Sequence, residues 1–323
     1  MNKAVVVALC LPLYLFVHAA SAQPPYPTKP VRLVVPFPPG GGVDATARVL
    51  SQKLTEAWRQ QVLVDNRTGG GTTIGNEIAA HAAPDGYTLL LTNNALAVSA
   101  GLYPRLRYDV GKDLLPIMQV VRAPFVLTVP SSSTVRSVQD LVALARSRPG
   151  EIAMANAGIG SGPHLAAVLF AAMTGISVNH IPYKGGGPAI QDVIAGRVQS
   201  SFASPLAAAP HVQTGRVRLL AVTSAKRAIA LPEIPTMAEA GVKDYDVTTW
   251  YMLLAPARTP RAIIDQLNRD AGAAFRQPDA MRIVGGEGNE LVLSTPDDAA
   301  VLLRGELARW AKVIKQANLK PED

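Results

Sequence analysis

The sequence predicts an α/β protein made of two units, with the chain crossing between them twice. Short β-branched runs alternate with segments of helical periodicity, which indicates parallel strands connected by helices in an open sheet. The expected strands are more numerous than one open sheet usually holds, so we expect two sheets. Residues 123–129 and 249–255 have strand character without glycine, and we expect the two crossings there.

The first unit begins with the β-branched run 31–35, which ends at Pro36 and is typical of a buried strand. From Val43 to Trp58, apolar residues recur at spacings of three and four, which predicts a helix. The expected elements that follow are a strand at 61–64, a helix at 74–82 and a strand at 87–91, the last two separated by the turn signal Pro84-Asp85-Gly86.

The same alternation continues through the second half of the chain. Strands are expected at 152–155, 178–181, 198–203, 217–222 and 250–255, and helices at 138–146, 164–173, 189–195 and 206–213. Three further helices are expected at 260–276, 278–283 and 296–317, because each begins at a proline in the first-turn position.

The first residues indicate an export signal. A short basic segment, 1–3, precedes an apolar run over 4–17, and Ala20-Ser21-Ala22 has the small residues that signal peptidase accepts. The run is too short for a membrane anchor, so we expect cleavage near Ala22 and a periplasmic protein. The single cysteine, Cys10, leaves with the peptide, which excludes a disulfide and a thiolate nucleophile.

Composition excludes several other classes. The chain is 48% hydrophobic and 17% charged, which is typical of a protein with a sizeable core. Its formal charge is +7, but the basic residues are scattered and form no run with interleaved aromatics. We therefore expect no nucleic-acid partner.

Four glycine-rich or polar loops share one context, because each follows an expected strand and precedes an expected helix. They span 36–42, 92–94, 156–162 and 183–187. The carboxyl ends of strands in such sheets are where ligands bind, and free N–H groups at a helix start favour an anion. The alternative is that they are ordinary strand–helix turns. None contains a G-x-x-x-x-G-K-[ST] or G-x-G-x-x-G pattern, so a nucleotide is not expected.

Catalytic signatures are weak. The four histidines outside the signal segment are isolated in the sequence, so no metal is expected. We expect His164 to have a packing role rather than to act as a ligand or a base. Ser161 lies in Gly160-Ser161-Gly162 and not in a G-x-S-x-G elbow, and no pair of acids stands out for general acid–base work. We expect no catalytic residue and no cofactor, with an exported enzyme as the weakest alternative.

Five motifs together resemble the Bug family, the periplasmic receptors of tripartite tricarboxylate transporters. They are Val35 to Gly41, Asp65 to Gly75, Ala83 to Leu89, Ile181 to Gly185, and Leu254-Ala255-Pro256 with Thr259-Pro260. The resemblance covers the chain after the signal segment. It implies a type II periplasmic binding protein fold, in which backbone groups and water hold a small carboxylate between two lobes without a metal.

The resemblance also implies which residues bind the ligand and where the chain departs from the family. Asp44 matches a family acid, although a charge at a helix N-terminus explains it equally well. Ser204 stands where the family usually has an aspartate residue, and Met252 stands where it usually has glycine. Because of these two departures the identity of the ligand stays open among free aspartate, glutamate, citrate and other dicarboxylates. The implied ligand-binding residues are Phe37, Gly40, Gly41, Thr92, Asn93 and Asn94 in the first lobe, and Asn156, Gly158, Ser161, Tyr183, Lys184, Gly185 and Ser204 in the second.

The expected organisation is a signal peptide at 1–22, one lobe from 23–125 and 249–323, and another from 126–248. The expected function is capture of a small carboxylate by a monomer and its delivery to a membrane permease of the tripartite tricarboxylate type. The alternative partner is the periplasmic domain of a sensor kinase.

Overall fold

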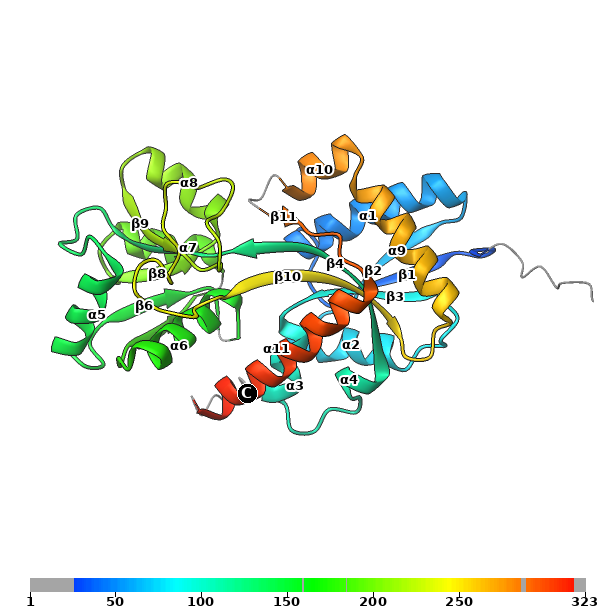
Figure 1. The fold of residues 1–323 in the computed structure, drawn as a ribbon, viewed down its shortest axis with the longest axis horizontal. Helices are drawn as coiled ribbons and strands as arrows, with labels where there is room; N and C mark the ends of the chain where they lie inside the picture. The colour runs from blue at the N-terminus through cyan, green and yellow to red at the C-terminus, as the bar shows by residue number, and fades with distance from the viewer. Residues whose placement is uncertain (1–25, 159, 184, 286–288, 317–323) are drawn as a thin grey trace, which may run out of the picture.

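The computed structural model describes residues 26–158, 160–183, 185–285 and 289–316 of the chain. It has two lobes side by side, each built on one sheet with helices packed against it (Figure 1). The chain passes to the second lobe through the consecutive strands β4 (Leu114–Pro124) and β5 (Val126–Pro130) and returns through β10 (Thr248–Pro256). Both crossings fall where the sequence predicts them, and the exact lobe boundaries within these strands stay a prediction.

The first lobe contains a six-stranded sheet in the order β11-β4-β10-β3-β1-β2. Its other strands are β1 (Val31–Val35), β2 (Val62–Asn66), β3 (Thr88–Asn93) and β11 (Glu290–Leu291). β1 pairs in parallel with β2 and β3, whereas β10 is antiparallel to both β3 and β4.

The second lobe contains a five-stranded sheet in the order β7-β6-β8-β5-β9. Its other strands are β6 (Ala153–Asn156), β7 (Asn179–Pro182), β8 (Ser200–Ala203) and β9 (Val217–Val222). β6 is parallel to β7 and β8, but β5 is antiparallel to β8 and β9.

The expected parallel pairing therefore holds for only part of each sheet, and the crossings explain why. The strands that lead into the predicted site loops, among them β1, β3, β6 and β7, run toward the other lobe, so their carboxyl ends face it. A strand that enters a lobe from the other one must run the opposite way, as β5 and β10 do.

The helices expected from periodicity all form, with ends shifted by a few residues. They are α1 (Gly42–Trp58), α2 (Thr73–Ala80), α5 (Val138–Ser147), α6 (Gly162–Thr174), α7 (Gly186–Ile194), α8 (Pro205–Gln213), α9 (Arg261–Phe275), α10 (Pro278–Gly285) and α11 (Pro296–Gln316). The sequence predicted neither α3 (Ala95–Leu102) nor the short α4 (Val110–Asp113), and it missed the 3₁₀ turn η1 (Gly70–Thr72). α3 is apolar nearly all round, so it has no amphipathic period to detect.

Side chains alternate across the crossing strand β10 and fill a core on each face of the first sheet. Trp250, Met252 and Leu254 enter one core, and Tyr251, Leu253 and Ala255 enter the other. The first of these cores continues into the second lobe. A smaller third core lies under α7 and α8.

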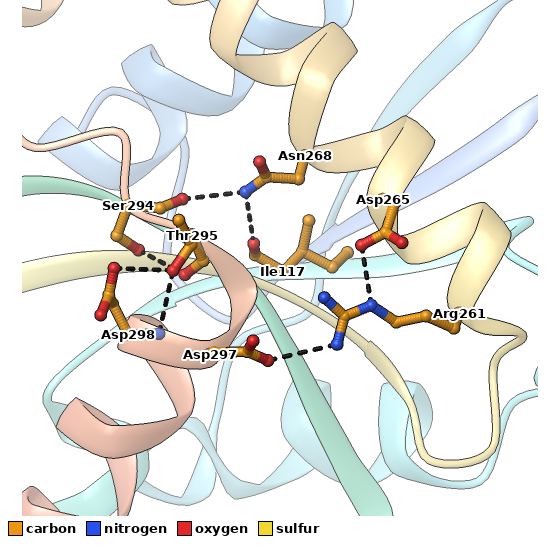
Figure 2. A network of polar contacts seen from close by, with 8 residues as sticks. All are labelled: Ile117, Arg261, Asp265, Asn268, Ser294, Thr295, Asp297 and Asp298. Atoms are coloured by element: carbon orange, nitrogen blue, oxygen red, sulfur yellow. Dashed lines mark hydrogen bonds and ion pairs between the residues drawn. The ribbon is translucent and has the colours of Figure 1, made fainter.

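The C-terminal helices pack back on the first lobe, as predicted, and polar contacts fix them there. Asn268 of α9 donates hydrogen bonds of 2.8 Å to the carbonyl oxygens of Ile117 on β4 and Ser294 before α11 (Figure 2). Arg261 joins Asp265 of its own helix and Asp297 of α11. These contacts hold two helices against the strand that leads to the second lobe.

Candidate ligand-binding site

The predicted loops lie at the carboxyl ends of strands, each at the start of a helix. In the first lobe they connect β1 with α1 and β3 with α3, and in the second lobe β6 with α6 and β7 with α7. Ser204, which the resemblance implies, lies at the corresponding place between β8 and α8. Because these strands point toward the other lobe, both sets of loops are presented to the space between the lobes.

A cavity of about 540 Å³ is lined by both lobes. The first lobe contributes η1 and the face of α3 with Ala95, Val98, Ser99 and Leu102, followed by Tyr103; the second contributes Gly160 and Ser161. None of these described lining residues carries a charge. Of the predicted ligand-binding residues that the structure describes, only Ser161 lines this cavity.

The η1 loop is the part of the site that the sequence prediction missed. Gly69, Gly70, Gly71 and Thr72 all have positive φ, at 120°, 55°, 59° and 82°. A side chain at Gly71 would place its Cβ 2.8 Å from the Tyr103 hydroxyl, so glycine is required there by both φ and space. The three consecutive glycines after β2 were the available signal, but their nearness to α3 and the second lobe depends on tertiary packing.

Asp44 holds the first predicted loop from inside the protein. It is 2% exposed, and its carboxylate accepts hydrogen bonds from the Gly40 N–H (2.9 Å), Asn66 Nδ2 (2.9 Å) and Arg48 Nε (2.8 Å). Burial alone would raise the pKa of the Asp44 carboxyl, but these hydrogen bonds outweigh it and lower the pKa below its ordinary value. Asn66 also donates to the Phe37 carbonyl oxygen. Asp44 thus fixes the loop that carries Gly40 and Gly41.

Three predicted residues carry buried polar atoms that have no hydrogen-bond partner among the described residues. These atoms are Thr92 Oγ1, Asn94 Nδ2 and Asn156 Nδ2. The Oδ1 atoms of the two asparagines are used within the protein, since Asn94 accepts from Thr249 and Asn156 from the Gly158 N–H. Asn93, in contrast, accepts from the Ala95 N–H at the start of α3. Each lobe therefore has a buried amide donor without a partner among the described residues, although neither asparagine lines the cavity.

The loop before α6 is fixed by its own helix. Ser161 Oγ caps α6 by accepting from the His164 N–H, and the Gly160 N–H donates to His164 Nδ1 at 3.1 Å. His164 is 5% exposed and packs edge-on against the His180 ring, with 5.3 Å between centroids. Burial, with a smaller contribution from His180, lowers the pKa of His164 to about 4. The ring is therefore neutral near pH 7 and accepts at Nδ1, in agreement with the packing role expected for it.

The loop before α7 has its tyrosine hydroxyl occupied. Tyr183 donates to Asp192 at 2.6 Å, and this contact is the main reason that the pKa of its hydroxyl is raised. Gly185 begins α7 with φ at 110°, a conformation that favours glycine. Lys184 lies outside the described residues.

The two departures from the Bug pattern have different surroundings. Ser204 is exposed and caps α8, where its Oγ accepts from the Ala207 N–H at 3.2 Å. Met252 is fully buried and pairs with Thr92 across β10 and β3, so it fills core space beneath the site and does not line the cavity.

Neither a metal centre nor a membrane span is found in the described part of the chain. No three His, Cys, Asp or Glu side chains among these residues lie close enough together to hold a metal ion. No helix that the structure describes has the length and apolar character needed to cross a bilayer.

Two lobes that present helix N-termini to a shared cavity define the class of two-lobed solute-binding proteins. More specifically, the chain belongs to the periplasmic receptors of the tripartite tricarboxylate transporter family, whose model matches residues 46–319. The resemblance to Bug proteins is thereby confirmed.

Individual relatives support the same assignment. BugT of Bordetella pertussis is 38% identical over 297 residues, which cover 91% of each chain. The structure of Rpa4515 from R. palustris with adipate shares 36% identity and a TM-score of 0.77, covering 92% of this chain and 100% of its own. MatC from Rhodopseudomonas palustris, solved with bound malate, shares 28% identity and a TM-score of 0.74, covering 90% and 100%.

Proposed function

We propose that this protein captures a small aliphatic dicarboxylate between its lobes in the periplasm and delivers it to a membrane permease. The observation that carries the proposal is the uncharged cavity shared by η1, α3 and the loop before α6. The predicted export signal that ends near Ala22 supports the location, and the predicted monomer fits a receptor that diffuses to its partner.

Neutral hydrogen-bond donors are well suited to hold a carboxylate in this cavity. Positively polarised N–H groups at helix starts attract an anion without a counter-cation, and hydrogen bonds to a charged group are stronger than neutral ones. Asn94 and Asn156 each have a buried amide hydrogen-bond donor without a protein partner, and such a group costs about 1–3 kcal/mol if left unpaired. A ligand carboxylate that accepts from both would favour the closed arrangement of the lobes.

The apolar wall of the cavity favours a ligand with a methylene chain. Val98 and Leu102 of α3 have no polar side-chain atoms, so they match CH₂ groups better than hydroxyl groups. Rpa4515 with adipate and MatC with malate both hold dicarboxylates, and the adipate complex belongs to the more similar protein. Adipate is therefore the first ligand to test, before malate.

Isothermal titration of the exported protein with adipate, malate and the uncharged adipamide tests this proposal. We expect heat with the acids, tighter binding of adipate than malate, and no binding of adipamide. If no acid gives heat, or if adipamide binds as well as adipate, carboxylate capture is wrong.

The variant Asn156→Asp tests the amide donor directly. It keeps an oxygen that accepts from the Gly158 N–H but replaces the donor by a second oxygen. We expect affinity to fall by about 10- to 100-fold, because the ligand loses a hydrogen bond and faces an added acceptor. Asn179→Asp is the matched control, since Asn179 is exposed at the amino end of β7, away from the loops. Circular dichroism checks that both variants fold.

A further inference from the structure

A second groove lies between the lobes and shares no lining residue with the ligand cavity. Its volume is about 660 Å³. The first lobe supplies the end of β4, α10 and β11, and the second lobe supplies residues from segment 224–230. In Figure 1, α10 and β11 lie on one side of the crossing strands, and α3 lies on the other.

Exposed apolar side chains gather at this groove. Ile229 is 86% exposed, and Met281 on the facing wall is 48% exposed. A side chain as exposed as Ile229 protrudes from the surface, which suits burial against another protein better than enclosure of a small molecule. Single exposed apolar residues are common, but a pair across a groove is typical of an interaction site.

Among the described lining residues the charges are mainly basic, and one of them has no ion-pair partner in this part of the chain. Arg122 pairs with Glu290 at 2.8 Å, and Arg227 pairs with Glu239 at 2.9 Å. Lys226, which is exposed and lies three positions before Ile229 in the sequence, forms no ion pair with any residue that the structure describes. A partner that buries Ile229 therefore gains most by placing a carboxylate opposite Lys226.

We propose that this groove docks the membrane permease through a periplasmic segment that carries an apolar side chain next to an acidic one. The proposal rests on the proposed function, because it names the partner to which the captured acid is delivered. The walls belong to different lobes, so a change in the angle between the lobes changes the width of the groove. A partner seated there distinguishes the ligand-bound receptor from the empty one.

The docking site is tested by measuring binding of the purified receptor to the permease. The permease is the tripartite tricarboxylate-type protein of the same organism, reconstituted in lipid nanodiscs. Ile229→Glu and Lys226→Glu should each weaken binding by about tenfold or more, because the first removes the apolar anchor and the second reverses the free charge. The loss caused by Lys226→Glu should shrink as salt is added.

Matched controls carry the same changes elsewhere on the surface. Val301→Glu alters a side chain on α11 that is 61% exposed, and Lys243→Glu reverses an exposed charge of the second lobe. Neither residue lines the groove. Both should bind the permease like the wild type. All four variants should titrate with adipate like the wild type, since none lies at the ligand cavity.

The outcomes separate docking from ligand capture. The docking site is wrong if the groove variants bind the permease like the wild type, or if the control variants lose binding equally. It is also wrong if the wild-type receptor does not bind the permease, with or without adipate. Failure of the proposed function shows itself separately, as absence of heat when adipate and malate are titrated into the receptor alone.

Discussion

His164 links protonation in the second lobe to the loop that lines the ligand cavity. Its Nδ1 accepts from the Gly160 N–H, and its ring is buried against His180. Protonation would place a second N–H donor opposite the Gly160 donor and leave a buried charge. The variant His164→Asn removes the titrating ring but provides an amide oxygen to accept from Gly160.

The size of the effect follows from the pKa of about 4 in the folded protein, against 6.5 as the ordinary value. As pH falls from 7, the unfolded chain takes up the proton first, so the free energy of unfolding decreases through this range. The decrease is about 2 kcal/mol between pH 7 and pH 5 and about 3 kcal/mol once pH reaches 4. Carboxyls with lowered pKa, such as Asp44, lose most of their stabilisation as pH falls through and below 3.8, so they contribute little between pH 7 and pH 5.

Urea denaturation at several pH values between 7 and 5 measures this decrease. His164→Asn should be less stable than the wild type at pH 7, because its side chain is smaller, but its stability should fall less toward pH 5. The pKa of His180 is also lowered by burial, so part of the decrease should persist in the variant. His81→Asn, at an exposed ring, is the control and should keep the wild-type slope. An unchanged slope in His164→Asn would refute the reasoning.

Substitutions at three further residues test other polar contacts. Asp44→Ala should lower the free energy of unfolding by about 2 kcal/mol, and Asp44→Asn should be intermediate between Asp44→Ala and the wild type. Unchanged stability of both variants in urea would contradict the role of Asp44 in its loop. Tyr183→Phe should lower the free energy of unfolding by about 1 kcal/mol but leave adipate affinity unchanged, because the hydroxyl already donates to Asp192. A tenfold loss of affinity would instead place that hydroxyl in the ligand site. Glu306→Ala should lower the free energy of unfolding by about 3 kcal/mol and alter tryptophan fluorescence, because two buried indole N–H groups lose their acceptor. Glu306→Gln should lower it less, and equal stability of the two variants would contradict this.

The positions of most elements could be predicted from the sequence because local periodicity reports which faces are buried. The α1 pattern is clear, since its buried residues recur at helical spacing on one face. α3 gave no such signal because both of its faces are apolar, and its Gly101 lies where a Cβ would come 2.9 Å from Ile314 of α11. That closeness depends on a helix more than 200 positions later in the chain, which no local pattern contains.

The candidate site divides in the same way. Loops at the carboxyl ends of strands follow from the order of strands and helices, so the loop 156–162 could be located without coordinates, whereas Asn156 and Ser161 were implied by the resemblance to the Bug family. The cavity wall could not, because η1 and α3 meet Gly160 only when the lobes are assembled. Tyr183 remains a predicted site residue, and the sequence does not show that its hydroxyl donates to Asp192 in the structure.

The sequence by itself determined the α/β class, the two crossings and the glycine-rich loops, because each depends on residues that are neighbours along the chain. Only the tertiary structure decided the mixed strand directions, the uncharged cavity and the second groove with Lys226 and Ile229. These features depend on how two lobes from interleaved parts of the chain are placed against each other. That placement is set by the crossing strands and the shared core, whose contacts join residues far apart in the sequence.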